Sequence, residues 1–346
     1  MFAPSPSPSF SERLVRDWYL PRRTLLTSAL TPLGWIFRIA AASRRFAYRF
    51  GPFRLTRVSV PVIVVGNITV GGTGKTPVVL WLAEQLTARG RKPGIISRGY
   101  GSEGATPRRV DPSDDAASAG DEPLLLAASG VPVWIGRDRA ATAQRLVESH
   151  SDVDVIVSDD GLQHYALLRD FEIVVVDGAR GFGNGALLPA GPLREPVSRL
   201  DSVDAVIVNG ADFVLPLIAA RTFTMTLRGD RFENLVDRRE AGAESLRTKR
   251  VHAVAGIGNP QRFFDALRAL GVAPKCHPFP DHHRFKASDL ALPDAEVIVM
   301  TEKDAIKCAS FADVRMWALP VVADLSDAGA LLLDQILEKI DGPQAA

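Results

Sequence analysis

The chain has 346 residues, of which 46% are hydrophobic and 23% are charged, and this length favours two globular domains. Its 24 prolines, 28 glycines and turn-bounded apolar runs exclude collagen, a coiled coil, a polytopic membrane protein and a wholly disordered chain. The two cysteines, Cys276 and Cys308, form no CxxC pair, so we expect neither a disulfide framework nor a thiolate metal cluster, and a reducing cytoplasm fits best.

The net charge of +1 conceals an uneven distribution along the chain. Residues 1–57 carry ten arginines against Glu12 and Asp17, a net charge of +8. The remaining residues hold 31 basic and 38 acidic side chains, a net charge of −7. We therefore interpret residues 1–57 as an arginine-rich N-terminal arm that precedes a mildly acidic body.

The arm starts with ten residues in which serine and proline recur, and we expect them to form a disordered tail. Only 14 uncharged residues separate Arg23 from Arg38, too few to span a bilayer, and no convincing cleavage site for a signal peptide follows. The apolar side chains from Trp35 to Ile39 lie among arginines, which favours docking on an anionic membrane surface. Packing of this segment on the protein's own core is the alternative. The high apolar content argues against a nucleic-acid-binding arm.

Short apolar runs alternate with helix-length intervals in the first part of the body. Because these runs are continuously apolar, they indicate a parallel sheet that is covered on both faces. The expected strands lie near residues 62–65, 94–96, 133–135, 155–157, 173–176 and 205–208, and helical spacing is found over 77–89 and 139–148. This pattern predicts a doubly wound, mostly parallel α/β domain over residues 58–210.

A second series of apolar runs follows, and it predicts a smaller α/β domain over residues 211–346. We place the boundary between Asn209 and Arg250, where the pattern weakens and charges accumulate. The expected elements are strands near 223–227, 251–255, 297–300 and 318–322 and helices near 260–270 and 327–340.

The sequence TVGGTGKTP at residues 69–77 follows the first strand and predicts a phosphate-binding loop (P-loop) that opens a helix. Its backbone N–H groups would face a polyphosphate, the Lys75 ammonium would reach the β and γ phosphates, and the Thr76 hydroxyl suits Mg²⁺. The consensus has glycine where this chain has Thr69. The expected nucleotide-binding residues are Thr69, Val70, Gly71, Gly72, Thr73, Gly74, Lys75 and Thr76.

Candidate catalytic groups lie in three other segments. Asp159 and Asp160 end a predicted strand, where a Walker B acid would hold Mg²⁺, although an Asp-rich turn is the alternative. Transfer to an alcohol needs a base, and the Asp121 segment (GDEP) and the His282 segment (DHH) each offer one. In GPLREP, Arg194 could stabilise a transferring phosphoryl group, and a surface salt bridge between Arg194 and Glu195 is equally compatible with the sequence.

These segments together resemble one family, the tetraacyldisaccharide 4′-kinases (lipid A 4′-kinases) of Gram-negative bacteria, over nearly the whole chain. The matching blocks are VGNITVGGTGKTP (65–77), SRGYG (97–101), GDEPLLLA (120–127), DDGLQH (159–164), LLPAGPLREP (187–196), AGIGNPQRFF (255–264), FPDHHRF (279–285) and TEKDAIK (301–307). The resemblance implies transfer of the ATP γ phosphate to the 4′-hydroxyl of tetraacyldisaccharide 1-phosphate, giving lipid IVA. It also implies a peripheral enzyme at the cytoplasmic face of the inner membrane.

The resemblance further implies roles for individual residues. Asp121 and His282 would form a catalytic dyad, in an interdomain cleft that closes on ATP. Lys75 and Arg194 are the other expected catalytic residues; the expected Mg²⁺ ligands are Thr76, Asp159, Asp160 and Glu195; and the expected substrate contacts are Arg98, Tyr100, Gln163 and His164. We expect a monomer that does not bind nucleic acid.

Two other classes of protein remain compatible with a P-loop. Another small-molecule kinase or an ATP-dependent ligase would explain the ATP site but not the basic, apolar arm. A nucleotide-dependent switch ATPase is disfavoured because Val70 stands where the MinD-type ATPases carry a lysine.

Overall fold

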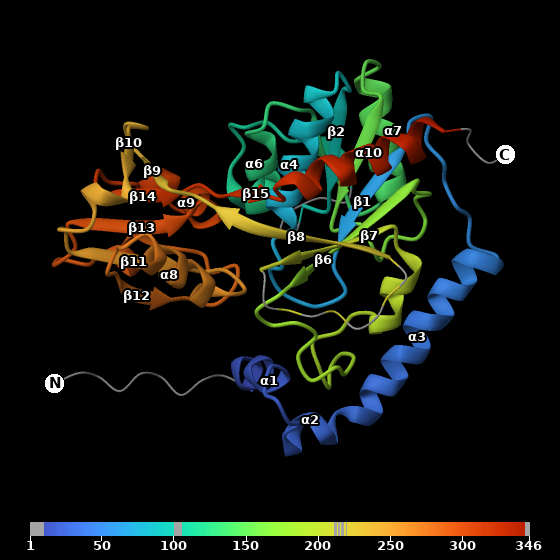
Figure 1. The fold of residues 1–346 in the computed structure, drawn as a ribbon, viewed down its shortest axis with the longest axis horizontal. Coiled ribbons are helices and arrows are strands. Elements are labelled where there is room, and N and C mark those ends of the chain that lie inside the picture. The colour runs from blue at the N-terminus through green and yellow to red at the C-terminus, as the bar shows by residue number, and fades with distance from the viewer. Residues whose placement is uncertain are drawn as a thin grey trace.

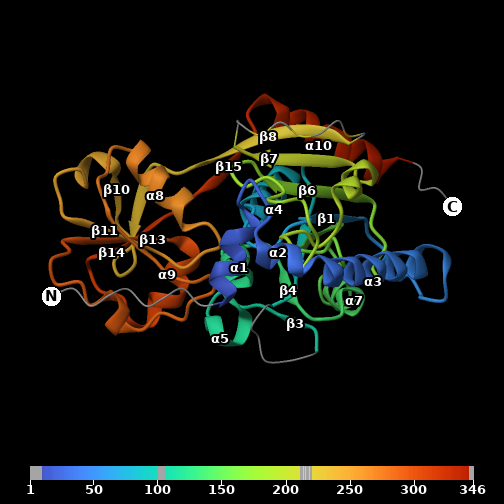
Figure 2. The same ribbon diagram turned by 90° about the horizontal axis from the view of Figure 1, so that it is seen from below.

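The computed structural model describes residues 10–99, 106–210, 213, 215, 218 and 220–342. Two sheets lie side by side and form two lobes, the large lobe (residues 58–228 and 322–341) and the small lobe (residues 231–319) (Figures 1 and 2). Both lobes mix helices with mainly parallel strands, as the sequence predicted.

The large lobe contains a sheet of nine strands. Its strands are β1 (Val62–Gly66), β2 (Pro93–Ser97), β3 (Arg108–Arg109), β4 (Val133–Ile135), β5 (Val155–Asp159), β6 (Phe171–Asp177), β7 (Ala205–Asn209), β8 (Arg221–Arg228) and β15 (Val322–Asp324). Its helices are α4 (Lys75–Ala88), α5 (Ala116–Ala119), α6 (Asp121–Ala127), α7 (Arg139–Ser149) and α10 (Asp327–Asp341). The strand order is β15-β8-β7-β6-β1-β5-β2-β4-β3, and only the outermost strands, β15 and β3, pair antiparallel with their neighbours.

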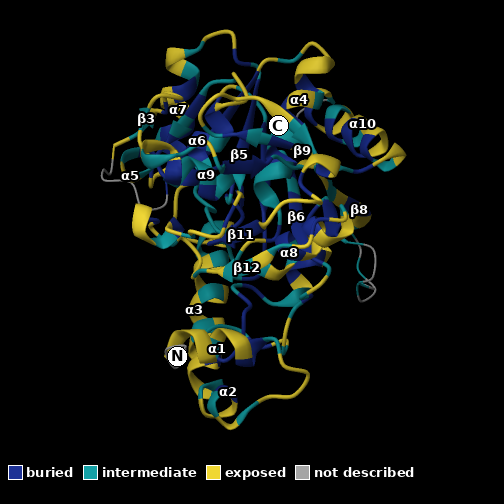
Figure 3. Cartoon of the chain, turned by 90° about the vertical axis from the view of Figure 1, so that its left-hand side faces the viewer, coloured by how far each residue is buried: buried dark blue, intermediate teal, exposed yellow. Residues whose placement is uncertain are grey.

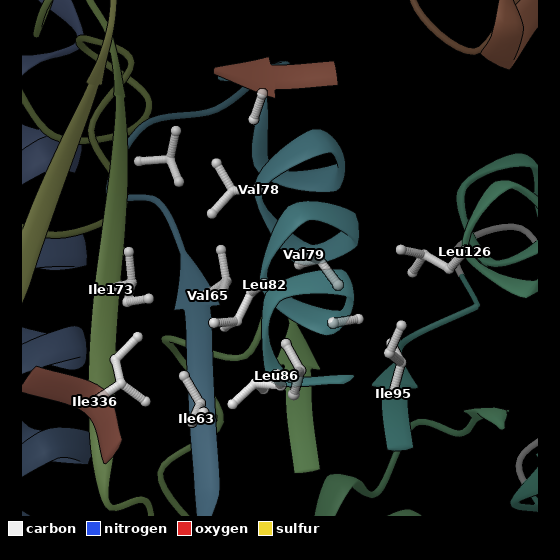
Figure 4. Packing of buried hydrophobic residues seen from close by; sticks show 14 of the residues in the cluster. Ile63, Val65, Val78, Val79, Leu82, Leu86, Ile95, Leu126, Ile173 and Ile336 are labelled. Atoms are coloured by element: carbon white, nitrogen blue, oxygen red, sulfur yellow. The ribbon is translucent and has the colours of Figure 1, made fainter. Parts of the chain in front are cut away.

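The strands of the large lobe are buried because helices cover both faces of the sheet. β1 and β5 are buried at every residue, which explains their continuous apolar runs. On one face, Val79, Leu82 and Leu86 of α4 pack on the sheet together with Ile336 of α10, as Figure 4 shows. On the other face, α7 contributes Leu146.

The small lobe contains a sheet of six strands in the order β10-β9-β14-β13-β11-β12. Its strands are β9 (Arg231–Asn234), β10 (Glu240–Gly242), β11 (Val251–Ala255), β12 (Lys275–Pro278), β13 (Val297–Thr301) and β14 (Met316–Leu319), and its helices are α8 (Pro260–Ala269) and α9 (Glu302–Cys308). Strands β11, β12, β13 and β14 run parallel to one another. β9 pairs antiparallel with β14, and β10 pairs antiparallel with β9. Phe232, Phe264 and Trp317 belong to the core of this lobe.

The predicted domain boundary at residue 210 does not coincide with the division between the sheets. β8 pairs in parallel with β7, and β15 returns the chain to the large sheet by pairing with β8. Leu332 and Ile336 of α10 are then fully buried in the large core. The last strand and helix belong to the large lobe because their apolar side chains complete its core. The order of apolar runs along the sequence does not indicate which of the two cores a run joins.

The arm contains three helices, α1 (Phe10–Trp18), α2 (Leu25–Ala29) and α3 (Thr31–Phe50). The predicted tail lies outside the described residues except for Phe10, which begins α1. The Thr24 side chain accepts a hydrogen bond from the Thr27 N–H and caps α2, and Pro32 lies in the first turn of α3, where its missing N–H costs nothing. Figure 3 shows that the arm projects from the body with much of its surface exposed. Among the described helices, none is both long and apolar enough to cross a bilayer.

Truncation of the α4 core is expected to destabilise the large lobe. Leu82→Ala would remove a fully buried side chain between α4 and the sheet, which should lower the free energy of unfolding by about 2 to 5 kcal/mol. Glu84→Ala, at an exposed position on the same helix, is the control and should change it by less than about 0.5 kcal/mol. Urea denaturation measures both values, and equal losses would contradict the packing described.

Candidate active site

A cavity of about 830 Å³ lies between the two lobes, at the carboxyl ends of the parallel strands of the large sheet. The large lobe lines it with residues 71–77, with Asp159 and Asp160, and with Arg194. The small lobe lines it with residues 257–259, α8, His282 and Lys303. Ligands of α/β sheets bind at this edge, so the cavity is the candidate active site.

The loop between β1 and α4 forms one wall of the cavity. Gly71 and Gly74 have φ values of 91° and 94°, a backbone conformation that favours glycine. Two asparagines hold the loop: the side-chain amide of Asn67 donates to the Gly71 carbonyl (3.3 Å), and that of Asn209 donates to the Thr73 carbonyl (3.0 Å). Gly74 is the N-cap of α4, so the N-terminus of this helix faces the cavity and favours an anion there.

Asp160 lies among positive charges at the end of β5. Its carboxylate is 3.4 Å from the Lys75 ammonium and 3.4 Å from the Arg194 guanidinium. Burial alone would raise the pKa of Asp160, but the charges of Lys75, Arg194 and Arg139 outweigh it and hold the pKa well below its usual range. Asp160 is therefore ionised and links the P-loop lysine to the GPLREP segment.

The pKa of Asp159 is shifted in the opposite direction to that of Asp160. The Ser97 hydroxyl donates to its Oδ2 (3.1 Å), whereas its Oδ1 is buried without a hydrogen-bond partner among the described residues. Burial, together with the negative charges of Glu122 and Asp160, raises the pKa of Asp159 to about 7. A buried carboxylate oxygen without a partner beside a second carboxylate fits a divalent cation.

Asp121 and His282, from different lobes, approach each other beside the cavity, which His282 lines and Asp121 does not. His282 Nδ1 lies 3.6 Å from Asp121 Oδ2, and Asp121 is also 3.8 Å from the Lys303 ammonium and 3.6 Å from that of Lys307. Burial disfavours the Asp121 carboxylate, but His282 and the two lysines outweigh this effect and lower its pKa to about 2. The Asp121 carboxylate in turn raises the pKa of His282.

Glu195 lies outside the cavity lining, in a buried polar network. Its two carboxylate oxygens accept hydrogen bonds from the Gln163 amide (2.8 Å) and the Tyr165 hydroxyl (2.8 Å), and Arg199 is 3.3 Å away. Gln163 also donates to the Asn67 carbonyl at the start of the P-loop (3.1 Å). Each carboxylate oxygen of Glu195 thus already accepts a hydrogen bond within this network.

The remaining predicted residues lie in different places. Arg98 lines the cavity, whereas His164 does not. Burial, followed by the positive charges of Arg139 and Arg98, lowers the pKa of His164 to about 4, so its ring is neutral near pH 7. Tyr100 lies outside the described residues.

Several residues of the site were not singled out in the sequence. Arg139 is almost fully buried and donates to the Asp159 carbonyl (2.9 Å), and Lys303 and Lys307 face Asp121 from α9. The four-residue spacing of the two lysines in TEKDAIK places them on one helix face and could have indicated an anionic partner. Asn67 and Asn209 directly follow or end buried strands, a position that could have indicated the sheet edge.

Across one cavity, the large lobe presents a lysine beside two carboxylates, and the small lobe brings an imidazole to a third carboxylate. This arrangement can bind an anionic phosphate and deprotonate a hydroxyl, so fold and cavity define an α/β phosphotransferase.

Comparisons with known proteins identify the family. A model of the tetraacyldisaccharide-1-P 4′-kinase family matches residues 26–340. Proteins named tetraacyldisaccharide 4′-kinase are similar over most of the chain: that of Azoarcus sp. is 54% identical (90% of this chain, 91% of its own), and that of Dechloromonas aromatica is 51% identical (96% and 98%). The crystal structure of LpxK from Aquifex aeolicus in complex with ATP has a TM-score of 0.76 and 30% identity, over 90% of this chain and 99% of its own.

The chain therefore belongs to the tetraacyldisaccharide 4′-kinase family. It is a kinase that phosphorylates the 4′-hydroxyl of tetraacyldisaccharide 1-phosphate. The resemblance of its motifs to this family, and the function expected from it, are confirmed.

Proposed function

We propose that ATP binds in the cavity between the lobes with its phosphates on residues 69–76. The glycine conformations, the N-terminus of α4 and the Lys75 ammonium support this placement. LpxK from Aquifex aeolicus was crystallised in complex with ATP, which supports the same phosphate donor here. Arg194 lines the cavity 3.4 Å from Asp160, and we propose that it stabilises charge on the transferring phosphoryl group.

Magnesium is the metal that we propose for this site. The buried Oδ1 of Asp159 and the Asp160 carboxylate would hold it, with the Thr76 hydroxyl at the start of α4. In the described part of the chain, no three His, Cys, Asp or Glu side chains form a metal-binding group, and Mg²⁺ would take its other ligands from phosphate oxygens and water. When bound, Mg²⁺ would neutralise charge on the phosphates.

We propose that His282 accepts the proton of the 4′-hydroxyl and that Asp121 orients the imidazole. The Asp121 carboxyl, with a pKa of about 2, is a weak base, whereas the pKa of His282 is raised. The Asp121 carboxylate at 3.6 Å from Nδ1 favours the tautomer with the proton on Nδ1, in which Nε2 is the nitrogen that accepts a proton. The positive charge that then develops on the ring is stabilised by the same carboxylate.

Transfer of labelled γ phosphate from ATP to tetraacyldisaccharide 1-phosphate in detergent micelles tests these roles. Lys75→Ala, Asp121→Asn and His282→Ala should each lower the rate by about 10²-fold or more, because each removes a group that acts on the reacting atoms or positions one. Asp313→Asn, which removes an ion pair with Arg315 in the small lobe, is the control and should retain wild-type activity. Wild-type rates in the Asp121 and His282 variants would rule out the dyad.

The pH dependence of kcat/KM should report the protonation of His282. Its protonated ring cannot accept a proton, so activity should fall about tenfold per pH unit below its raised pKa. Asp121 and Asp281 raise this pKa, whereas Lys303 on α9 lowers it. The acid limb should therefore move to lower pH in Asp121→Asn and to higher pH in Lys303→Met. Limbs that coincide in both variants would contradict the assignment of the base.

We further propose that α3 docks the enzyme on the cytoplasmic face of the inner membrane, where it acts as a monomer on its lipid substrate. One face of α3 packs on the body: Gly34 is buried against the Leu187 carbonyl, and the ring of Tyr48 lies 6.0 Å from that of Tyr165. The remaining surface of the helix is apolar and basic. Its exposed large apolar residues are Leu33, Trp35, Ile36, Ile39, Phe46 and Phe50, and the exposed arginines beside them are Arg38, Arg44 and Arg49.

Sedimentation with phosphatidylglycerol vesicles measures this docking. Trp35→Ser with Ile39→Ser should weaken binding by about tenfold or more, because each side chain contributes apolar area to the membrane contact. Leu331→Ser, which changes an equally exposed side chain on α10, is the matched control and should bind as the wild type does. Equal binding by all three proteins would exclude α3 as the docking element.

A further inference from the structure

Arg180 contacts three parts of the molecule at once. It follows β6, and its guanidinium donates to the Asp177 carboxylate (2.8 Å), to the Gly72 carbonyl of the P-loop (2.6 Å) and to the Gly258 carbonyl of the small lobe (2.9 Å). The ring of Tyr19, just after α1, lies 5.2 Å from the guanidinium carbon. We propose that Arg180 is a positioning residue for ATP that joins the P-loop to the arm and to the small lobe, so that Tyr19 belongs to the nucleotide site.

The first step of the argument concerns the peptide groups of the P-loop. Side chains hold three consecutive carbonyls, because Asn67 donates to Gly71, Arg180 to Gly72 and Asn209 to Thr73. In a planar trans peptide, the N–H points away from the carbonyl of the same group. Fixing these carbonyls therefore fixes the directions of the next three N–H groups, those of Gly72, Thr73 and Gly74, which line the cavity.

Of the three side chains that donate to these P-loop carbonyls, Arg180 is the charged one. Its bond to Gly72 is the shortest of the three, and a hydrogen bond from a charged group is stronger than one from an amide. Asp177 is buried at the end of β6 and holds the Arg180 side chain in place. Removing the guanidinium should leave the P-loop free to adopt conformations in which the N–H groups diverge.

Asp177 also contacts residues of the small lobe. It pairs with Arg262 of α8 and lies 3.5 Å from the Asn259 amide. Gly258 approaches the P-loop so closely that a Cβ there would lie 2.7 Å from the Gly72 nitrogen. The two lobes therefore contact each other through Arg180 at the point where the phosphates are proposed to bind.

The arm reaches this point through Tyr19. Its hydroxyl donates to the Val70 carbonyl (3.4 Å), and its ring covers one side of the Arg180 guanidinium. The preceding residue, Trp18, is anchored to the body by bonds to Pro189 and Asn184. An arm that served only to dock on membranes would have no effect on ATP affinity in the absence of lipid, whereas an arm that acts through Tyr19 would.

Equilibrium binding of a non-hydrolysable ATP analogue with Mg²⁺, measured on the full chain without lipid, tests this inference. Arg180→Met should raise the Kd by about tenfold or more, and Arg180→Lys, which keeps the charge but lacks the fork of donors, should have an intermediate effect. Tyr19→Leu should raise the Kd by a few fold and should add nothing in the Arg180→Met background, since it acts through Arg180. Arg239→Met, which removes an arginine that also lies over an aromatic ring (Trp317, 5.1 Å) in the small lobe, is the matched control.

The KM for the lipid substrate should stay near the wild-type value in the Arg180 variants, which separates nucleotide positioning from a general loss of structure. Thermal unfolding identifies any variant that fails to fold, and Tyr19→Leu keeps the test open in that case. The inference depends on ATP binding at residues 69–76. Failure of the wild type to bind the analogue would refute that proposal, whereas wild-type Kd values in folded Arg180→Met and Tyr19→Leu would refute only the role of Arg180 and Tyr19.

Discussion

Burial of negative charge at the edge of the large sheet is the constraint on which the site depends. A carboxylate removed from water loses several kcal/mol of hydration unless cations compensate it. Asp159 is buried and Asp160 is partly buried, and Arg139 from α7, Lys75 from α4 and Arg194 lie around them. Three separate elements thus converge on two residues, and the groups needed for a phosphate are in place before it arrives.

The sequence could predict those parts of the site whose polar residues end a buried strand or directly follow one. β1 leads into the P-loop and β5 ends at Asp159, so the parallel pairing of β1 with β5 places both at one sheet edge. The predicted strands and the glycine-rich loop were therefore sufficient to place Lys75 and the two aspartates at the same edge of the sheet. The same continuous apolar runs indicated the mainly parallel sheets of the fold.

Contacts between distant segments could not be predicted in this way. Asp121 and His282 lie 161 positions apart in the sequence, and only the resemblance to a family linked them. Lys303 and Lys307 entered the site only with the structure. The expected role of Glu195 at the metal stays a prediction; its oxygens accept hydrogen bonds from Gln163 and Tyr165 in a buried network that the sequence did not indicate. A sequence pattern records which groups follow a strand, whereas burial and competing partners depend on the packing of the whole lobe.

A kinase whose acceptor is a lipid must admit the membrane-bound substrate and still keep water from the phosphate. In this chain the predicted dyad takes Asp121 from the large lobe, which also carries the P-loop, and His282 from the small lobe, so the predicted site is complete only when the lobes are together. Polar contacts hold the lobes in that arrangement, among them Lys303 with Glu122 on one side of the cavity and Arg180 with Gly258 on the other. Since Tyr19 of the arm packs on the second of these contacts, the arm and the contact between the lobes are physically linked.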